Sequence, residues 1–274
     1  MKIALFQMNA GIDPAINARA LVNAVHTAAA GGADMLFTPE MAGCLDRDRE
    51  RSGAVIVTEA DDPVLAAVRG AARDVGLWVH LGSLALSDPA SGKRRNRGFL
   101  IDTQGEIRAR YDKIHLFDVD LPGGESWRES SSYVGGDHAV MARTPWGNLG
   151  LTICYDVRFP DLYRALSNAG ADIISVPAAF TVPSGEAHWH VLLRARAIES
   201  SAFVIATAQV GLHEDGRQTY GHSLVIDPWG TVLLDAGKEP GLYWADLPLE
   251  RIAEVRQRIP SLAHRRPIED IVIS

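Results

Sequence analysis

Apolar and polar positions along the chain follow two periods, and the changes between these periods divide the sequence into strands and helices. Short apolar, β-favouring runs bounded by Gly, Pro, Asn or Asp predict buried strands, the first at 3–7 (IALFQ). Apolar residues at helical spacing predict helices, the first from Ile16 to Gly31. The further strands predicted in this way are 35–38, 78–86, 98–102, 107–116, 139–142, 149–153, 173–176, 203–208, 222–226, 231–235 and 242–246. The further helices are 63–76, 160–169, 186–200 and 249–257.

The order of these elements predicts the fold class. Strand and helix alternate twice and are followed by consecutive strands, and the same series then occurs again. Two stacked mixed sheets with helices on their outer faces explain this order, so we expect a four-layer α-β-β-α sandwich. The sequence contains no internal repeat and no linker, which predicts a single domain over 1–274. Its last part, 259–274, has two prolines and no helical period and is expected to be an extended tail.

Composition and charge exclude several kinds of partner. The 274 residues are 47% hydrophobic with a net charge of −7, and the basic residues are scattered apart from 93–95 and 264–266. This argues against a nucleic-acid-binding surface. No apolar run is long enough to cross a membrane, and the first residues predict a strand instead of a signal peptide, so we expect a cytoplasmic protein. In that compartment Cys44 and Cys154 are expected to be free thiols.

Three chemically reactive side chains follow predicted strands. Glu40 comes after 35–38, Lys113 lies near the end of 107–116, and Cys154 follows 149–153 directly. Each has an ordinary interpretation when taken alone: a solvated carboxylate, a solvated lysine and an inert buried cysteine. Cys154, however, precedes a helix that begins at Pro160. Backbone N–H groups at such a strand-to-helix turn stabilise a thiolate or an oxyanion, so the position suits a nucleophile.

The segment 117–137 is a predicted loop of unusual length. It has no usable periodicity and is rich in Gly, Ser, Asp and Pro. Loops of this length in compact domains tend to be functional. The loop contains Glu125 and Glu129, either of which could instead be ordinary surface charge.

The residues around these three side chains resemble a known family. The segments that carry the resemblance are Thr38-Pro39-Glu40, YDKIHLF at 111–117, ICYDVRFP at 153–160, EAHWH at 186–190, YGHS at 220–223 and DPWG at 227–230. Together they resemble the nitrilase superfamily of carbon–nitrogen hydrolases, and within it the Nit-type amidases, which include deaminated glutathione amidases and ω-amidases. The resemblance extends over nearly the whole chain, from 4–8 to 265–267.

The resemblance implies a catalytic mechanism. The family's Glu-Lys-Cys triad corresponds to Glu40, Lys113 and Cys154, and its auxiliary glutamate to Glu129, with Glu125 as a nearby alternative. Glu40 is then the base that activates the thiol, while Lys113 lowers the thiol pKa and stabilises the oxyanion together with the Tyr155 N–H. A thioester forms, and water hydrolyses it to an acid after ammonia has left. No metal and no organic cofactor takes part.

The resemblance also implies a class of substrate, a small carboxylate-bearing amide such as deaminated glutathione or a related 2-oxo ω-amide. Arg158 is the expected ligand of the carboxylate because a guanidinium binds a carboxylate in a bidentate manner, and the Phe180 loop is expected beside the pocket. A nitrilase with the same triad is an alternative within the class. A non-catalytic interaction protein is an alternative from another class. The physiological substrate stays open.

Two further expectations concern metal binding and assembly. His188 and His190 could suggest a metal site, but positions two apart on a helix face different sides, so no metal site is predicted there. His188 is instead expected to be a packed residue near the pocket. The resemblance implies at least a homodimer, formed through the helices at 161–169 and 188–200.

Overall fold

Two six-stranded sheets form the centre of the computed structural model, which describes residues 1–120, 126–268 and 271–273. The first sheet has the order β16-β1-β2-β3-β4-β5. Its strands are β1 (Lys2–Gln7), β2 (Met35–Phe37), β3 (Trp78–Asp88), β4 (Lys93–Ile101), β5 (Ile107–Asp112) and β16 (Gly241–Asp246). The second sheet has the order β15-β14-β11-β10-β9-β8. Its strands are β8 (Val140–Thr144), β9 (Gly147–Leu151), β10 (Ile173–Ser175), β11 (Phe203–Ala206), β14 (Leu224–Ile226) and β15 (Val232–Asp235).

Each sheet has a parallel centre with antiparallel strands outside it. β1, β2 and β3 are parallel, as are β9, β10 and β11, and the pairs at the sheet edges are antiparallel. Because the carboxyl ends of parallel strands lie at one edge of a sheet, residues that follow β2 and β9 are brought to corresponding positions in the two sheets.

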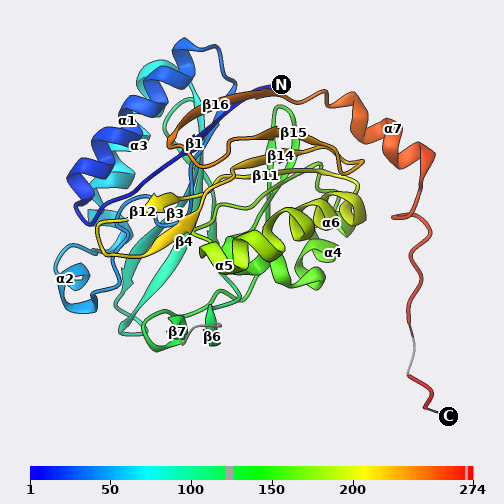
Figure 1. Ribbon diagram of the computed structural model, residues 1–274. Coiled ribbons are helices and arrows are strands. Elements are labelled where there is room, and N and C mark those ends of the chain that lie inside the picture. Colours follow the sequence, from blue (N-terminus) through cyan, green and yellow to red (C-terminus); the bar gives the residue numbers. More distant parts are fainter. Residues whose placement is uncertain (121–125, 269–270, 274) are drawn as a thin grey trace.

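Helices cover the outer face of each sheet (Figure 1). α1 (Pro14–Ala30) and α3 (Pro63–Val75) pack on the first sheet, and α4 (Pro160–Asn168) and α6 (His190–Ser200) pack on the second. Side chains alternate along β1: Ile3 and Leu5 belong to the core between the sheets, whereas Ala4 belongs to the core beneath α1 and α3. This arrangement confirms the predicted four-layer α-β-β-α sandwich.

The remaining elements are short. α2 (Arg49–Gly53) and α5 (Val182–Ser184) lie in loops, α7 (Glu250–Arg258) follows the last strand, and β12 (Val210–Leu212) pairs with β13 (Gln218–Tyr220). None of the helices in the described ranges combines the length and the apolarity that crossing a membrane requires.

Several segments differ from the sequence-based expectation, among them the unpredicted β12, β13, α2 and α5. β4 begins at Lys93 instead of near 98. The expected loop at 117–137 contains β6 (Asp118–Asp120), β7 (Ser126–Arg128) and a 3₁₀ turn, η2 (Glu129–Ser131). The helix expected at 186–200 begins with a π-helical turn, η4 (Gly185–Trp189).

The chain after α7 leads away from the body of the protein (Figure 1). It contains no further helix or strand among its described residues. Arg265 anchors its first part, because its guanidinium donates hydrogen bonds to Ser167 Oγ (3.0 Å) and to the Glu199 carbonyl oxygen (3.0 Å). The segment 271–273 is highly exposed.

Candidate active site

Glu40 lies just beyond β2, in a loop that packs closely against β3. A Cβ on Gly82 of β3 would lie 2.1 Å from the Thr38 carbonyl oxygen, so only glycine fits at this crossing. The Glu40 carboxylate is buried and accepts hydrogen bonds from Asn96 Nδ2 (2.8 Å) and from the Ala179 N–H (2.8 Å). These contacts join Glu40 to both sheets and fix its orientation.

Lys113 directly follows β5 and lies between two glutamates. Its backbone N–H donates to the Asn96 carbonyl oxygen (2.9 Å), and its side chain is only 3% exposed. Its Nζ is 3.0 Å from Glu40 Oε1, and 2.9 Å and 3.2 Å from Glu129 Oε2 and Oε1. An ammonium has three N–H donors. If one of them is shared between the two oxygens of Glu129 and a second binds Glu40, the third is left for a substrate.

Glu129 begins η2, immediately after β7. Its Oε2 accepts a hydrogen bond of 2.6 Å from the Phe117 N–H, and its Oε1 lies 3.4 Å from Asn96 Nδ2. These contacts hold the carboxylate against Lys113. Glu125, the alternative auxiliary glutamate, lies outside the described residues.

The charges of the buried ion pair stabilise one another. Burial alone would raise the pKa of Glu40, but the charge of Lys113 and hydrogen bonds outweigh burial and lower this pKa. Burial would likewise lower the pKa of Lys113, but the charges of Glu129 and Glu40 raise it well above its ordinary value. At neutral pH Glu40 is therefore a carboxylate and Lys113 an ammonium.

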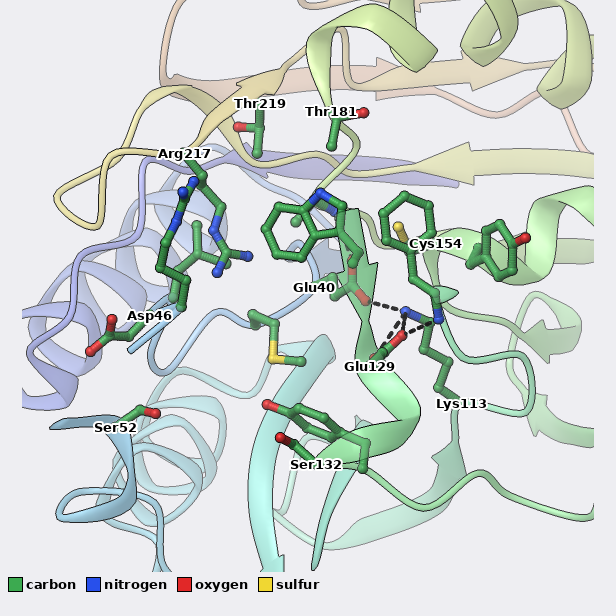
Figure 2. A pocket seen from close by; sticks show the side chains of 18 of the residues that line it. Glu40, Asp46, Ser52, Lys113, Glu129, Ser132, Cys154, Thr181, Arg217 and Thr219 are labelled. Carbon is green, nitrogen blue, oxygen red and sulfur yellow. Dashed lines mark hydrogen bonds and ion pairs between the residues drawn. The ribbon is translucent and has the colours of Figure 1, made fainter. Parts of the chain in front are cut away.

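Cys154 lies at the turn between β9 and the helical segment that follows. It begins a 3₁₀ turn, η3 (Cys154–Arg158), and its N–H donates to the Pro177 carbonyl oxygen (2.8 Å). Its φ of 49° falls in the left-handed region, which is strained for a side chain other than glycine. The strained turn places the thiol at the same end of the cavity as Glu40, Lys113 and Glu129 (Figure 2).

The thiol of Cys154 is protonated at rest. Burial, followed by the charge of Glu40, raises the pKa of Cys154 well above its ordinary value, and the opposing effect of Lys113 is smaller. Lys113 lowers this pKa, as expected, but burial and the charge of Glu40 outweigh its effect. The resting pair is a thiol beside a carboxylate, the state from which proton transfer to Glu40 can begin.

Asp156 holds the turn that carries Cys154. It is fully buried, and its Oδ2 accepts hydrogen bonds from the Ile153 N–H (2.8 Å) and the Tyr111 hydroxyl (2.7 Å). Its Oδ1 accepts from the His115 N–H (3.1 Å) and lies 2.7 Å from His115 Nδ1. Because both oxygens of this fully buried carboxylate are held by groups on either side of the turn, Asp156 fixes the turn.

A cavity of about 350 Å³ opens next to these residues. Of the described residues that line it, six are basic and three are acidic. The basic ones are Lys113 and the arginines Arg47, Arg49, Arg94, Arg128 and Arg217, and the acidic ones are Glu40, Asp46 and Glu129. A cavity with this lining favours an anionic ligand.

The expected substrate-binding residues do not all reach the cavity. Tyr155 and Phe180 line it, but Arg158 does not. The Arg158 guanidinium lies over the rings of Tyr155 (5.8 Å) and Phe180 (5.2 Å), and its Nη1 is 3.3 Å from His188 Nδ1. Arg158 thus packs against two residues that line the cavity without lining it itself. Sequence reasoning did not identify the arginines that do line the cavity.

The histidines at the start of α6 have separate surroundings. His188 contacts Arg158, whereas His190 Nε2 lies 3.0 Å from Asp235, which also contacts His222 Nδ1 (2.8 Å). The candidate ligand atoms of His190, His222 and Asp235 lie within 4.8 Å of one another. His188 and His190 thus have different partners, and the cluster of His190, His222 and Asp235 lies apart from the cavity lining.

A buried thiol, a buried carboxylate and a lysine between two glutamates are grouped beside one cavity of an α-β-β-α sandwich, an arrangement typical of a hydrolase. The family described as carbon-nitrogen hydrolase matches residues 2–257. The chain belongs to this carbon–nitrogen hydrolase family.

Named relatives agree with this assignment. A deaminated glutathione amidase of Synechocystis is 52% identical over 177 residues, which are 64% of this chain and 65% of that protein. The aligned segment thus spans just under two thirds of that relative. A deaminated glutathione amidase of Bos taurus is 38% identical over 269 residues, covering 97% of this chain and 82% of that protein.

Solved structures have the same fold. The Caenorhabditis elegans NitFhit protein matches with a TM-score of 0.89 at 37% identity, over 97% of this chain and 65% of that chain. An amidase from Nesterenkonia matches with a TM-score of 0.78 at 30% identity, over 95% of both chains. A variant of that amidase carries acrylamide added to its active-site cysteine.

Proposed function

We propose that the protein is a cysteine-dependent amidase acting on a small carboxylate-bearing amide. The observation that carries this proposal is the Cys154 thiol beside the ionised Glu40, with Lys113 held 3.0 Å from Glu40 and 2.9 Å from Glu129. All four residues face the arginine-lined cavity. The family assignment and the names of the relatives support the same activity.

The first half of the reaction forms a thioester. Glu40 accepts the thiol proton as Cys154 Sγ bonds to the amide carbonyl carbon, and the carbonyl electrons move to its oxygen. Lys113 Nζ and the Tyr155 N–H, in the first turn of η3, stabilise this oxyanion. The carbon–nitrogen bond then breaks, and the nitrogen leaves with the proton that Glu40 returns.

The second half releases the acid. Glu40 takes a proton from water, whose oxygen attacks the thioester carbonyl carbon. The carbon–sulfur bond breaks, and the sulfur regains a proton from Glu40, which restores the thiol and the carboxylate. Glu129 keeps Lys113 oriented through both steps without exchanging a proton.

The leaving group depends on the amide. A primary ω-amide releases ammonia, as the sequence comparison with ω-amidases suggested. Deaminated glutathione is a tripeptide derivative in which all amide bonds are secondary, so its hydrolysis releases an amine. An assay that records only ammonia would miss that reaction, and both products need to be measured.

Turnover by the wild type and by two variants tests the proposal. We expect purified wild-type protein to hydrolyse ω-amides and the amide bond of deaminated glutathione, and Cys154→Ala to lose this activity. Cys44→Ala tests the second thiol, which also lines the cavity but whose Sγ donates to the Ile12 carbonyl oxygen (3.4 Å), and it should keep the activity. Hydrolysis of the matching nitriles in place of the amides would favour a nitrilase.

The proposal includes a cytoplasmic homodimer. Both cysteines are free, as is usual for proteins of a reducing compartment. On α6, Val191 and Ile198 are 68% and 50% exposed, which is unusual for large apolar side chains on one helix and suits contact with a second copy. Leu193 and Ala197 of the same helix are instead buried within the chain.

A further inference from the structure

Arg217 is held rigidly at the cavity, in the loop between β12 and β13. Its N–H and its Nε donate to the two oxygens of Asp215 (3.0 Å and 2.8 Å), whose side chain is fully buried. Its guanidinium carbon lies 5.0 Å from the centre of the Trp127 ring. The terminal Nη1 and Nη2 nitrogens form no hydrogen bond with any other described residue, so the end that binds a carboxylate in bidentate fashion stays available.

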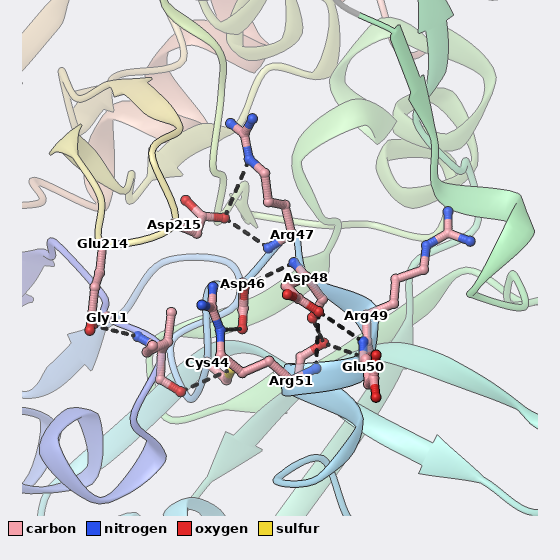
Figure 3. A network of polar contacts seen from close by, with 12 residues as sticks. Gly11, Cys44, Asp46, Arg47, Asp48, Arg49, Glu50, Arg51, Glu214 and Asp215 are labelled. Carbon is pink, nitrogen blue, oxygen red and sulfur yellow. Dashed lines mark hydrogen bonds and ion pairs between the residues drawn. The ribbon is translucent and has the colours of Figure 1, made fainter.

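Arg47 places a second guanidinium on the same ring. Its guanidinium carbon is 5.8 Å from the Trp127 centre, and its Nε is 3.9 Å from Asp215 Oδ2. Two guanidinium groups thus share the single carboxylate of Asp215, which Figure 3 shows for Arg47. Two cations with one anion leave an excess of positive charge at this place.

The neighbouring acid in the cavity lining does not remove this excess. Asp46 accepts hydrogen bonds from Arg51 Nε (2.7 Å) and Nη2 (2.8 Å) (Figure 3). Arg51 is not among the residues that line the cavity. Arg94, which also lines the cavity, donates to Ser52 Oγ (3.0 Å) and forms no ion pair within the described ranges. Neutral acceptors orient Arg94 but do not compensate its charge.

The excess positive charge lies away from the reactive thiol. Figure 2 shows Arg217 and Asp46 on one side of the cavity, and Cys154, Lys113 and Glu129 on the other. A ligand with its amide carbonyl at Cys154 therefore extends its opposite end toward Arg217. This step depends on the proposed amidase function, because that function decides which end of the ligand lies at Cys154.

We propose that Arg217, assisted by Arg47, binds a carboxylate at the end of the substrate remote from the scissile amide. Asp215 and Trp127 are positioning residues that present the guanidinium. The substrate class is accordingly an extended, peptide-like amide with a terminal carboxylate. An amide whose only carboxylate lies next to the reacting end does not reach Arg217.

A matched pair of probes tests this assignment. Glutaramoyl-glycylglycine carries a remote carboxylate, and its methyl ester has the same length without the charge. For Arg217→Gln we expect KM for the acid to rise at least about tenfold, with kcat changed less than KM and a much smaller effect on the ester. Arg217→Lys retains a charge but not the planar fork, so it recovers only part of the affinity. Ammonia and amine release are both recorded.

Two further variants control the experiment. Arg143 is exposed, lies outside the cavity lining and has no ion pair with a described residue, so Arg143→Gln leaves both probes unaffected. Arg47→Gln removes the more exposed of the two guanidiniums. We expect it to raise KM for the acid but not for the ester, by less than Arg217→Gln does. This variant tests the subsite if Arg217→Gln fails to fold. Equal changes for acid and ester, or a change below twofold for the acid, would overturn the proposal.

Binding to wild-type protein separates this proposal from the amidase function. If no amide is hydrolysed, the proposed amidase function is wrong. The affinities of the two probes, measured by calorimetry, then still show whether Arg217 binds the remote carboxylate. Tighter binding of the acid that Arg217→Gln abolishes supports the subsite. Equal affinity for acid and ester, or no binding of either, contradicts it.

Discussion

The Tyr111 hydroxyl donates a hydrogen bond of 2.7 Å to Asp156 Oδ2, across the two sheets. Tyr111 lies in β5, two residues before Lys113, and Asp156 lies two residues after Cys154. The bond therefore connects two segments: the strand that precedes Lys113 and the turn that contains Cys154. It fixes the relative position of the two reactive groups.

Loss of this connection should affect stability and turnover together. Tyr111→Phe removes one of the bonds to Asp156 and should lower the free energy of unfolding by about 1 kcal/mol. Asp156→Asn should cost about 3 kcal/mol, because its amide NH₂ faces protein donors in either orientation. Urea unfolding measures both values. A cost for Asp156→Asn no larger than that for Tyr111→Phe would contradict this role.

The pH dependence of kcat/KM should lack a fall near neutrality. Glu40 has a lowered pKa, so its base function is lost only as pH falls below its ordinary value of 4.5. Cys154 has a raised pKa, so the thiol stays protonated until pH rises above its ordinary value of 9.0. The free enzyme should thus give a plateau between these limits. A half-maximal point between pH 6 and pH 8, about the range of histidine titration, would indicate a different base.

Glu129 should affect kcat more than KM. Glu129→Gln removes a charge that holds Lys113, so the oxyanion loses part of its stabilisation, and we expect kcat to fall about 10- to 100-fold. Glu125→Gln is the matched control and should change kcat little. If Glu125→Gln showed the larger loss, the auxiliary glutamate would be Glu125.

Chelation should leave turnover unchanged, since the proposed steps use only side chains and water. Activity measured before and after treatment with EDTA tests this. A loss that zinc restores would point to the cluster of His190, His222 and Asp235, and His190→Ala would then have to show the same loss.

The parts of the site that sequence predicts are those that follow buried strands. Glu40, Lys113 and Cys154 each come after a run whose period identifies a strand, and strand ends gather at one place in such folds. Arg217 and Asn96 carry no such signal. Arg217 depends on the approach of separate loops around Trp127, and Asn96 lies in the polar first half of β4.

The polar first half of β4 shows why hydrophobic periodicity did not predict a strand there. Arg95 and Arg97 of β4 form ion pairs with Asp112 of β5 (3.0 Å and 2.6 Å), so the strand is stabilised by charge pairs instead of apolar contacts. The partners of a strand become known only once the sheet order is known. The π-helical start of α6 likewise depends on tertiary packing, since Tyr220 lies against Gly185.

Amide hydrolysis by Cys154→Ala tests the central claim most directly. Wild-type protein should release ammonia or amine, and Cys154→Ala, with an unchanged thermal unfolding midpoint, should be slower by at least about 1,000-fold, because the thiol that forms the acyl intermediate is lost. A folded Cys154→Ala protein that kept about a tenth of wild-type activity would contradict the assignment of the nucleophile.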